Sequence, residues 1–325
     1  MKKITLSPAV ATILLLLAAM IWGFAFSAQQ QATAYLGSFT ITCVRSVIAV
    51  VAISLAVMGF DRVRGNGRHL FSVRNGRFRI DLTRTELVGG IFCGITLAMA
   101  TMLQQFGLAF NQSAGKTAFI TSLYVVFVPC IGLFFGRRTS FPVFLGVLGA
   151  VAGAFVLAFD FSGGESIGLS TGDLLVLACA VMFALQIMAI DRYSPKGDGI
   201  RLSLVQFSVV SVVSLPLSLI FEGASTTGAD LVSALPSLLF LGIGSSGIAY
   251  TLQIVAQRRA HPAVACSVMS LESVFGMLGG ILFFGTMPSL QEGIGCAILF
   301  VAVLYTQLIA THEEEKEKRQ KEEKI

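Results

Sequence analysis

The stretch SVMSLESVFGMLGGILFFG (residues 267–285) is long and apolar enough to cross a lipid bilayer, yet it contains one formal charge, Glu272. About 20 apolar residues form a helix that spans the hydrocarbon core of a membrane. A carboxylate near the centre of such a helix costs about 2.5–3.5 kcal/mol to insert, so it must face protein or water. The rest of the chain indicates what provides that environment.

The composition of the 325-residue chain is typical of a membrane protein. Hydrophobic residues make up 55% of the chain, charged residues make up 13%, and the mean hydropathy is +0.81. A soluble domain has about 25% charged residues. The six cysteines lie apart within apolar stretches, which favours free thiols. We therefore expect no cofactor and no metal site. The N-terminal apolar run is interpreted as a retained helix, because no cleavage motif follows it.

Apolar runs of spanning length recur along the chain, and each is expected to form a transmembrane helix. Loops rich in arginine or lysine alternate with loops that carry acids or no charge. Of the 23 basic residues, only Arg45 and Lys116 lie outside these basic loops and the two termini. Basic loops remain in the cytoplasm, so we predict a multi-pass protein of the plasma or inner membrane with both termini cytoplasmic. The ten predicted spans are residues 8–28, 37–60, 86–109, 115–136, 141–160, 172–190, 202–221, 231–255, 261–285 and 290–311.

Two polar segments lie outside the spans. The basic loop of residues 61–85 contains Asn75-Gly76 between alternating residues, a pattern typical of a β-hairpin. A small cytoplasmic hairpin is one hypothesis for this loop, and its arginines are expected to contact anionic lipid head groups rather than nucleic acid. Residues 312–325 are expected to form a charged cytoplasmic tail.

The segment that carries the carboxylate has a counterpart in the first half of the chain. QFGLAFNQSAGKTAFITSLYVVFVPCIGLFFG (residues 105–136) aligns with residues 253–285 and places Tyr124 over Glu272. Upstream, CVRSVIAVVAISL resembles LVQFSVVSVVSLPL. The alignment indicates two repeats of five spans, and because five is odd, the second repeat must enter the membrane inverted.

We therefore expect an all-α integral membrane protein with ten transmembrane helices arranged as two inverted five-helix repeats. The first repeat is predicted over residues 1–163 and the second over residues 164–311. In such an arrangement, the binding site lies near the membrane midplane between the two repeats.

Four motifs resemble the EamA-type transporters of the drug/metabolite transporter superfamily, and the resemblance covers nearly the whole chain. The motifs are AAMIWGFAF (residues 18–26), CVRSVIA (43–49), SAGKTAFITSLYVVFVP (113–129) and AHPAVACSVMSLESVFG (260–276). The resemblance implies a ten-helix fold, a central cavity and metabolite transport, commonly export. Ser273 stands where this helix of the family often has proline, which weakens the expectation of a kink there.

Three charged residues lie within or at the edge of spans. Glu272 is interpreted either as a proton carrier or binder of a cationic substrate group, or as the partner of Arg45 in a structural ion pair. Burial favours the neutral form of a carboxyl group, which would let Glu272 take up and release protons. Arg45 either binds a substrate carboxylate or has a structural role, which is slightly favoured. Lys116 is expected to extend to the outer interface, and the alternative is steering of an anionic group.

Four uncharged side chains are further candidates for substrate binding. Trp22, the only tryptophan, either stacks on the substrate or packs in the core. Tyr124 is expected to line the cavity opposite Glu272. Gln105 and Gln253 align in the two repeats, and they either lie near opposite mouths of the cavity or bond neighbouring helices.

Three further motifs are interpreted as structural. GIGSSG (residues 242–247) fits a dinucleotide-binding pattern, but it lies inside an apolar span, where its glycines are expected to serve helix packing. AGKT (residues 114–117) lacks the earlier glycine of a phosphate-binding loop. Gly149 and Gly153 have the G-x-x-x-G spacing that packs helices within one protomer or between two protomers. A homodimer is therefore one of two possibilities for this motif.

These features together predict a secondary active transporter of small organic metabolites that works by alternating access and is coupled to protons. Amino acids or their analogues are the first substrates to consider, and export is the expected direction. The expected partners are a small-molecule substrate, protons and the lipid bilayer. The alternatives are a facilitative uniporter or channel, and a lipid-modifying membrane enzyme. Such an enzyme would need a nucleophile or metal cluster near Glu272, and the sequence shows no such motif, so no enzymatic activity is expected.

Overall fold

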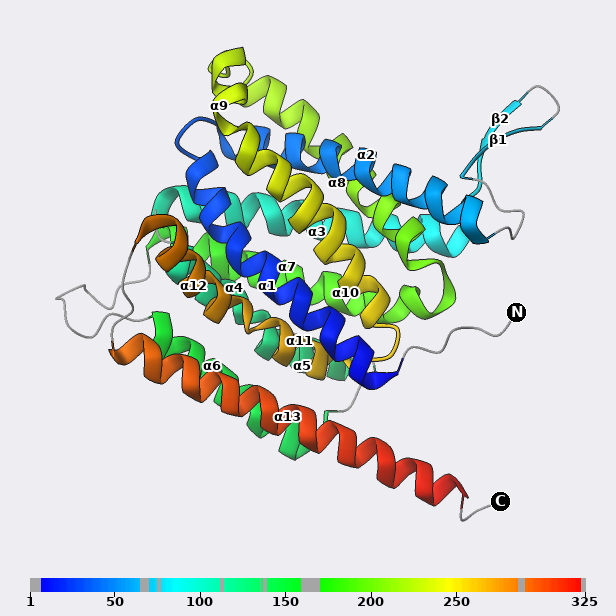
Figure 1. The fold of residues 1–325 in the computed structure, drawn as a ribbon, viewed down its shortest axis with the longest axis vertical. Helices are drawn as coiled ribbons and strands as arrows, with labels where there is room; N and C mark the ends of the chain where they lie inside the picture. Colours follow the sequence, from blue (N-terminus) through cyan, green and yellow to red (C-terminus); the bar gives the residue numbers. More distant parts are fainter. Residues whose placement is uncertain are drawn as a thin grey trace.

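The computed structural model describes residues 7–64, 70–74, 77–111, 114–134, 136, 139–158, 170–285 and 290–322. In these residues the chain is helical apart from one short β-hairpin (Figure 1). The elements are α1 (Pro8–Ala32), α2 (Ser38–Arg64), β1 (Phe71–Arg74), β2 (Arg77–Ile80), α3 (Arg84–Asn111), α4 (Ala114–Ser122), α5 (Tyr124–Phe134), α6 (Phe141–Ala158), α7 (Thr171–Tyr193), η1 (Ser194–Lys196), α8 (Gly199–Phe221), α9 (Gly228–Leu239), η2 (Phe240–Ala249), α10 (Tyr250–Ala256), α11 (Pro262–Met269), α12 (Glu272–Phe284) and α13 (Leu290–Glu322).

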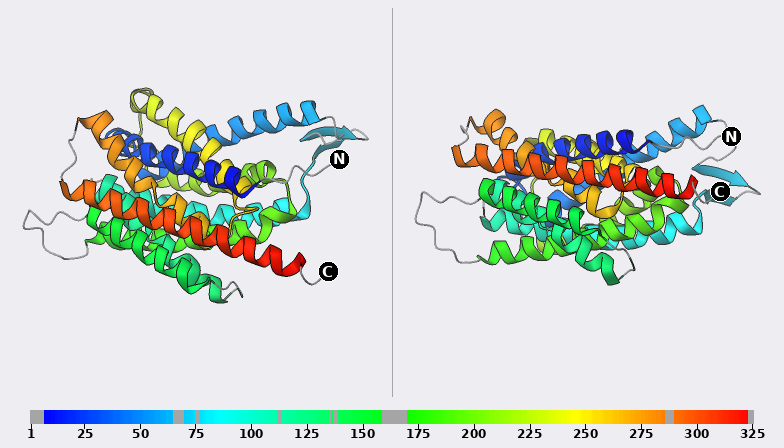
Figure 2. Two further views of the ribbon diagram at one scale, coloured as in Figure 1. Left: turned by 60° about the horizontal axis from the view of Figure 1, so that its bottom comes forward. Right: turned by 90° about the horizontal axis from the view of Figure 1, so that it is seen from below.

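Most of the long helices run close to one common direction (Figure 2). Within the described residues, eight helical segments are long and apolar enough to cross a membrane, when α4 with α5, α9 with α10, and α11 with α12 are each counted as one. Two shorter apolar helices, Phe141–Val156 and Gly293–Ile309, fall inside two further predicted spans. The prediction of a multi-pass helical membrane protein is therefore confirmed.

Two of the predicted spans are interrupted near their middle. α5 begins at Tyr124, shortly after the end of α4, and α12 begins at Glu272, shortly after the end of α11. At the breaks the backbone bonds three rather than four residues back, as when Val126 N donates to Leu123 O at 2.9 Å. The two breaks place Tyr124 and Glu272 at corresponding points of the aligned segments.

A serine precedes each break. Ser122 Oγ donates to Ala118 O at 2.7 Å, and Ser270 Oγ donates to Ser267 O at 2.8 Å. Such bonds to the preceding turn often bend a helix, although the same bonds from Ser208, Ser211 and Ser214 leave α8 continuous. The second segment breaks even though Ser273 replaces the proline that is frequent in the resembling family.

The GIGSSG motif lies in a π-helix. η2 continues α9 and leads into α10 in the middle of one long helical segment. Its Gly242 permits close contact with α2, because a Cβ on Gly242 would lie 2.5 Å from Ile48 Cβ and 3.1 Å from Arg45 O. The packing role predicted for these glycines is confirmed at Gly242. π-Helical turns are frequent at functional sites.

The hypothesis of a β-hairpin between α2 and α3 is also confirmed. β1 and β2 pair antiparallel, with Arg74 opposite Arg77, so two residues connect the strands. These two residues, Asn75-Gly76, lie outside the described residues. The hairpin extends beyond one end of the helix bundle (Figure 1).

A buried ion pair ties the hairpin to the bundle and joins α2 to α8. Arg201 Nη2 lies 2.7 Å from Asp61 Oδ1, and the two side chains are 3% and 8% exposed. Asp61 Oδ2 also accepts a hydrogen bond from Leu70 N at 2.9 Å, and Arg201 donates to Asp81 O. Leu70 and Asp81 flank the two strands, so both ends of the hairpin are held by the same ion pair.

Gly149 and Gly153 pack α6 against α13 within one chain. A Cβ on Gly153 would lie 2.4 Å from Leu299 N, and a Cβ on Gly149 would lie 3.1 Å from Ala302 Cβ. α6 and α13 lie side by side at one edge of the molecule (Figures 1 and 2). Of the two roles considered for this motif, the structure shows the intramolecular one.

Candidate functional site

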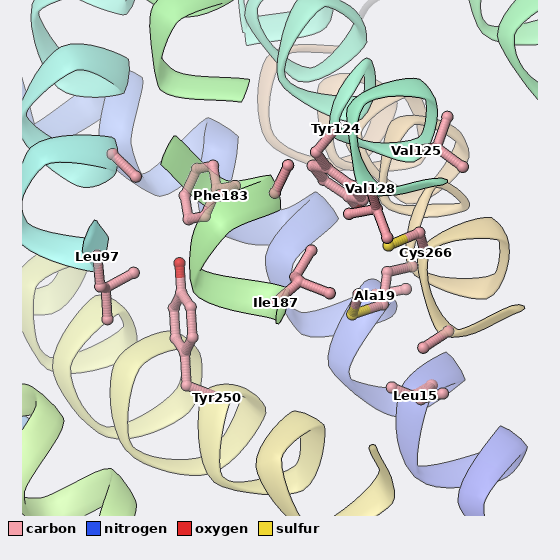
Figure 3. Close-up of a cluster of buried hydrophobic side chains, with 14 of the residues drawn as sticks. Leu15, Ala19, Leu97, Tyr124, Val125, Val128, Phe183, Ile187, Tyr250 and Cys266 are labelled. Atoms are coloured by element: carbon pink, nitrogen blue, oxygen red, sulfur yellow. The ribbon is translucent and has the colours of Figure 1, made fainter. Parts of the chain in front are cut away.

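A central cavity lies where the two halves of the chain meet. The cavity is narrow in this conformation, with a volume of about 30 Å³, which leaves room for about two water molecules. Figure 3 shows Tyr124, Phe183, Ile187 and Tyr250, four of the lining residues. The full lining is Trp22, Ala25, Phe26, Gln29, Arg45, Gln104, Thr121, Tyr124, Phe183, Ile187, Ser245, Tyr250, Gln253, Met269 and Glu272.

Glu272 is the first residue of α12, shortly after the helix break, and it lines this cavity. The residue is 4% exposed, and its Oε1 has no hydrogen-bond partner among the residues that the structure describes. The Tyr124 hydroxyl lies near the carboxyl group, but its Oη also lacks a partner in hydrogen-bonding geometry. A buried carboxyl group with an unused oxygen is suited to hold a proton or a cationic group.

The backbone around Glu272 is packed tightly against α1. Gly23 makes this crossing close, because a Cβ at Gly23 would lie 2.3 Å from Phe275 Cβ and 2.7 Å from Glu272 O. The neighbouring Trp22 lines the cavity. Small residues at such crossings allow helix backbones to approach each other in membranes. The position of Glu272 is therefore set by α1 as well as by the helix break.

Arg45 lines the same cavity but does not pair with Glu272. Its Nε donates to Ser246 Oγ at 3.0 Å, its Nη1 to Gln29 Oε1 at 3.2 Å, and its Nη2 to Ser245 Oγ at 2.9 Å. All three acceptors are uncharged. The structural ion pair considered for Arg45 and Glu272 is therefore absent between these two described side chains.

Aromatic rings form much of the cavity wall. The Trp22 and Tyr250 rings are 4.8 Å apart, and Tyr250 also contacts Phe207 at 5.4 Å between centroids. Tyr124 and Phe183 form an edge-to-face pair at 6.4 Å. Trp22 Nε1 is buried and has no hydrogen-bond partner. Trp22 packs in the cavity wall, and stacking on the substrate stays a prediction.

The remaining predicted candidates have different positions. Gln253 lines the cavity, and its Oε1 has no partner. Gln105 is buried with both amide atoms unpartnered, but the neighbouring Gln104 lines the cavity instead, where its Nε2 donates to Thr121 Oγ1 at 3.2 Å. The side chain of Lys116 lies outside the described residues.

Several lining residues were not predicted from the sequence. Gln29 lies within a run of three glutamines, Ser245 within the GIGSSG motif, and Tyr250 one helical turn before Gln253. The spacing of Tyr250 and Gln253 is the signal that could have found Tyr250, because residues three apart share a helix face. Among the described residues, no group of three His, Cys, Asp or Glu side chains is placed to hold a metal ion.

Comparison with known proteins matches most of the chain to one family. The model of the EamA-like transporter family matches residues 9–159 and again residues 170–307. An uncharacterized transporter of Archaeoglobus fulgidus is 26% identical over 300 residues, which cover 90% of this chain and 84% of that protein. The uncharacterized inner membrane transporter YedA of Escherichia coli K12 is 25% identical over 233 residues, covering 70% and 71% of the two chains.

A protein of known crystal structure has the same fold. The two structures superpose with a TM-score of 0.72 and 18% sequence identity. The match covers 95% of this chain and 100% of the other protein. An uncharacterized transporter of Methanothermobacter thermautotrophicus is 27% identical over 213 residues, covering 64% of this chain and 61% of that protein.

Proposed function

The chain belongs to the EamA-like transporter family, and on this basis we propose that it is a secondary active transporter of small organic metabolites. The proposed cycle is alternating access coupled to protons. Amino acids or their analogues are the first substrate class to test, with export the proposed direction. The observation that carries the proposal is Glu272, a buried carboxyl group in a central cavity that forms no ion pair with another of the described residues.

Ten transmembrane helices in two inverted repeats are the architecture that we propose, with both termini cytoplasmic. Two equivalent helix crossings support it. A Cβ on Gly242 would contact Ile48 and Arg45 O, and a Cβ on Gly94 would contact Val209 and the carbonyl of Gln206, the residue that aligns with Arg45. The two separate matches to the family, residues 9–159 and 170–307, support the same division.

The broken helices provide the proposed moving parts. Tyr124 and Glu272 begin the second half of each broken helix and line one cavity. Transporters with inverted repeats bind substrate at such discontinuities near the membrane midplane. A protonated Glu272 is neutral and tolerates burial, whereas a substrate cation would favour release of that proton. Exchange of one for the other couples substrate movement to the proton gradient.

The lining also bears on the enzyme alternative. Among the described residues that line the cavity there is one carboxyl group and neither histidine nor cysteine. An intramembrane enzyme would need a nucleophile with its base, or a metal site, beside Glu272. The composition of the wall therefore favours binding and release over covalent chemistry.

A two-step experiment tests the proposal. Thermal unfolding of the purified protein with a metabolite library identifies a substrate, since a ligand at 100 times its Kd stabilises a protein by about 2.7 kcal/mol. Flux of that substrate is then measured in proteoliposomes with and without a pH gradient. In Glu272→Gln we expect a folded protein whose flux no longer responds to pH, while the exposed-carboxylate control Asp230→Asn behaves as wild type. Unchanged pH dependence in Glu272→Gln would refute the coupling role.

A further inference from the structure

Arg45 brings a positive charge to the cavity without a neutralising partner. It is 4% exposed, and none of the ion pairs between described residues involves it. Its hydrogen-bond acceptors are two serine hydroxyls and one glutamine carbonyl. A buried charge is unfavourable unless a charge of opposite sign accompanies it.

The guanidinium is held in a fixed position and still has unused donors. Arginine has five N–H donors, and three of them are taken by Ser246, Gln29 and Ser245. Two N–H donors remain, one on Nη1 and one on Nη2. Because Gln29, Arg45 and Ser245 all line the cavity, these neighbours anchor the group at the cavity wall.

Helix packing alone does not explain this charge. Gln206 aligns with Arg45 in the other repeat and makes the equivalent close crossing with an uncharged side chain. Gln206 Oε1 accepts a hydrogen bond from Gln186 Nε2 at 3.2 Å, which ties α8 to α7 without any ion. A neutral amide therefore serves the structural purpose, and the arginine requires a different explanation.

We propose that Arg45 is an anion subsite of the cavity, and that the transported molecule carries a carboxylate or another small anionic group that binds there. The inference rests on the proposed transport function and specifies the chemistry of its substrate. The planar guanidinium presents parallel donors to a carboxylate and, unlike a lysine, remains charged when buried. Gln29 and Ser245 orient the group without neutralising it, so the charge stays available to the ligand.

The two charged groups lie at separate points of the cavity. Arg45 and Glu272 line the same cavity, but among the described residues they form no ion pair with each other. A ligand that places an anionic group at Arg45 leaves Glu272 free for a proton or for a cationic group of the same ligand. The Arg45 subsite therefore selects for an anionic group independently of proton coupling at Glu272.

Trp22 is a built-in reporter for this subsite. It is the only tryptophan of the chain, it lines the cavity, and its ring is 4.8 Å from that of Tyr250. The full-length protein in detergent micelles is titrated with sodium acetate, lactate and glycine while Trp22 emission is recorded. Sodium chloride and methylammonium chloride at matched ionic strength are the controls. We expect saturable changes with the three carboxylates and no comparable change with either control.

The variants test whether Arg45 causes the response. In Arg45→Met we expect the carboxylate response to disappear, and in Ser245→Ala, which keeps the charge but loosens the guanidinium, we expect several-fold weaker binding. If Arg45→Met fails to give a monodisperse protein, Arg45→Lys takes its place, with at least a tenfold loss expected. A carboxylate response equal to wild type in these variants overturns the proposal, as does a wild-type protein that responds to none of the carboxylates.

The two proposals can fail separately. If pH-driven flux of the identified substrate is present while carboxylate binding is independent of Arg45, the anion subsite is wrong and the transport function stands. If Arg45-dependent carboxylate binding is present without flux of any bound compound, the subsite stands and the transport function is wrong.

Discussion

Ser122 and Ser273 join the two broken helices where these helices meet: their hydroxyl oxygens lie 2.9 Å apart, and both residues are buried. Ser122 lies two residues before Tyr124, and Ser273 directly follows Glu272. The hydrogen bond therefore lies beside the two residues that begin the second half of each broken helix. In the repeat alignment Ser273 corresponds to Val125, which has no hydroxyl. The equivalent contact, between Ser270 and residue 125, therefore cannot form.

Replacing Ser273 with alanine should loosen this contact. A buried hydrogen bond contributes about 1 kcal/mol to stability, so Ser273→Ala is expected to lower the free energy of unfolding by about that amount and to alter the rate of substrate exchange. Thermal unfolding and exchange in proteoliposomes measure the two effects. The control is Ser211→Ala, because Ser211 Oγ donates only to Phe207 O within its own helix. Equal behaviour of the two variants would show that the contact between the helices has no special role.

The crossing at Gly23 gives a second prediction. A methyl group there would lie 2.3 Å from Phe275 Cβ and 2.7 Å from Glu272 O, so α1 and α12 must separate. We expect Gly23→Ala to destabilise the protein by about 1–3 kcal/mol, as overpacking does, and to reduce flux. Gly59→Ala is the matched control, because nothing lies within 4 Å of a Cβ at Gly59. Thermal unfolding of both variants checks the prediction, and a stable, fully active Gly23→Ala would contradict it.

The helical spans could be predicted from the sequence because bilayer thickness imposes a minimum length on every apolar run. The breaks could not be predicted, since the hydroxyl bonds that Ser122 and Ser270 make to the preceding turn also occur in continuous helices, as at Ser211 in α8. Ser273, in place of the proline frequent in the family, weakened the expectation of a kink there. Only the geometry shows that this segment breaks without a proline.

The cavity lining was predicted in part. Glu272, Arg45 and Gln253 were found because a charged or strongly polar residue inside an apolar span has few alternatives to facing protein or water. Gln104 lines the cavity instead of the predicted Gln105, although both are buried. Adjacent residues differ by about 100° around a helix axis, and the rotation of α3 depends on packing that no single segment reveals.

The ion pair between Asp61 and Arg201 gives a third prediction. Removing one partner of a buried pair leaves an uncompensated charge and costs about 3–5 kcal/mol. We therefore expect Arg201→Met to destabilise the protein strongly, and the double variant Asp61→Leu with Arg201→Met to recover much of the loss. Thermal unfolding of the single and double variants measures the coupling. If the double variant loses as much free energy of unfolding as the two single variants together, the ion pair is not the source of the stability.

Alternating access can be tested from the two ends of the cavity. α1 and the segment α9–η2–α10 run in opposite directions, because Gln31 contacts Ser237 and Trp22 contacts Tyr250. Gln29 and Gln253, which both line the cavity, therefore lie toward opposite ends of the bundle.

Cysteines placed at Gln29 and Gln253, one at a time, should react with a membrane-impermeant thiol reagent from opposite sides of the membrane. The background for both is a variant in which Cys130 and Cys296, the two native cysteines that are not buried, are replaced. With alternating access, a substrate gradient that increases labelling at one position must decrease labelling at the other. Each conformation opens one end of the cavity to solvent and closes the other end. A channel or open uniporter pathway would expose both positions together. Simultaneous labelling that substrate does not shift would therefore exclude the transporter cycle and leave a pore, with Glu272 acting as a selectivity group in its wall.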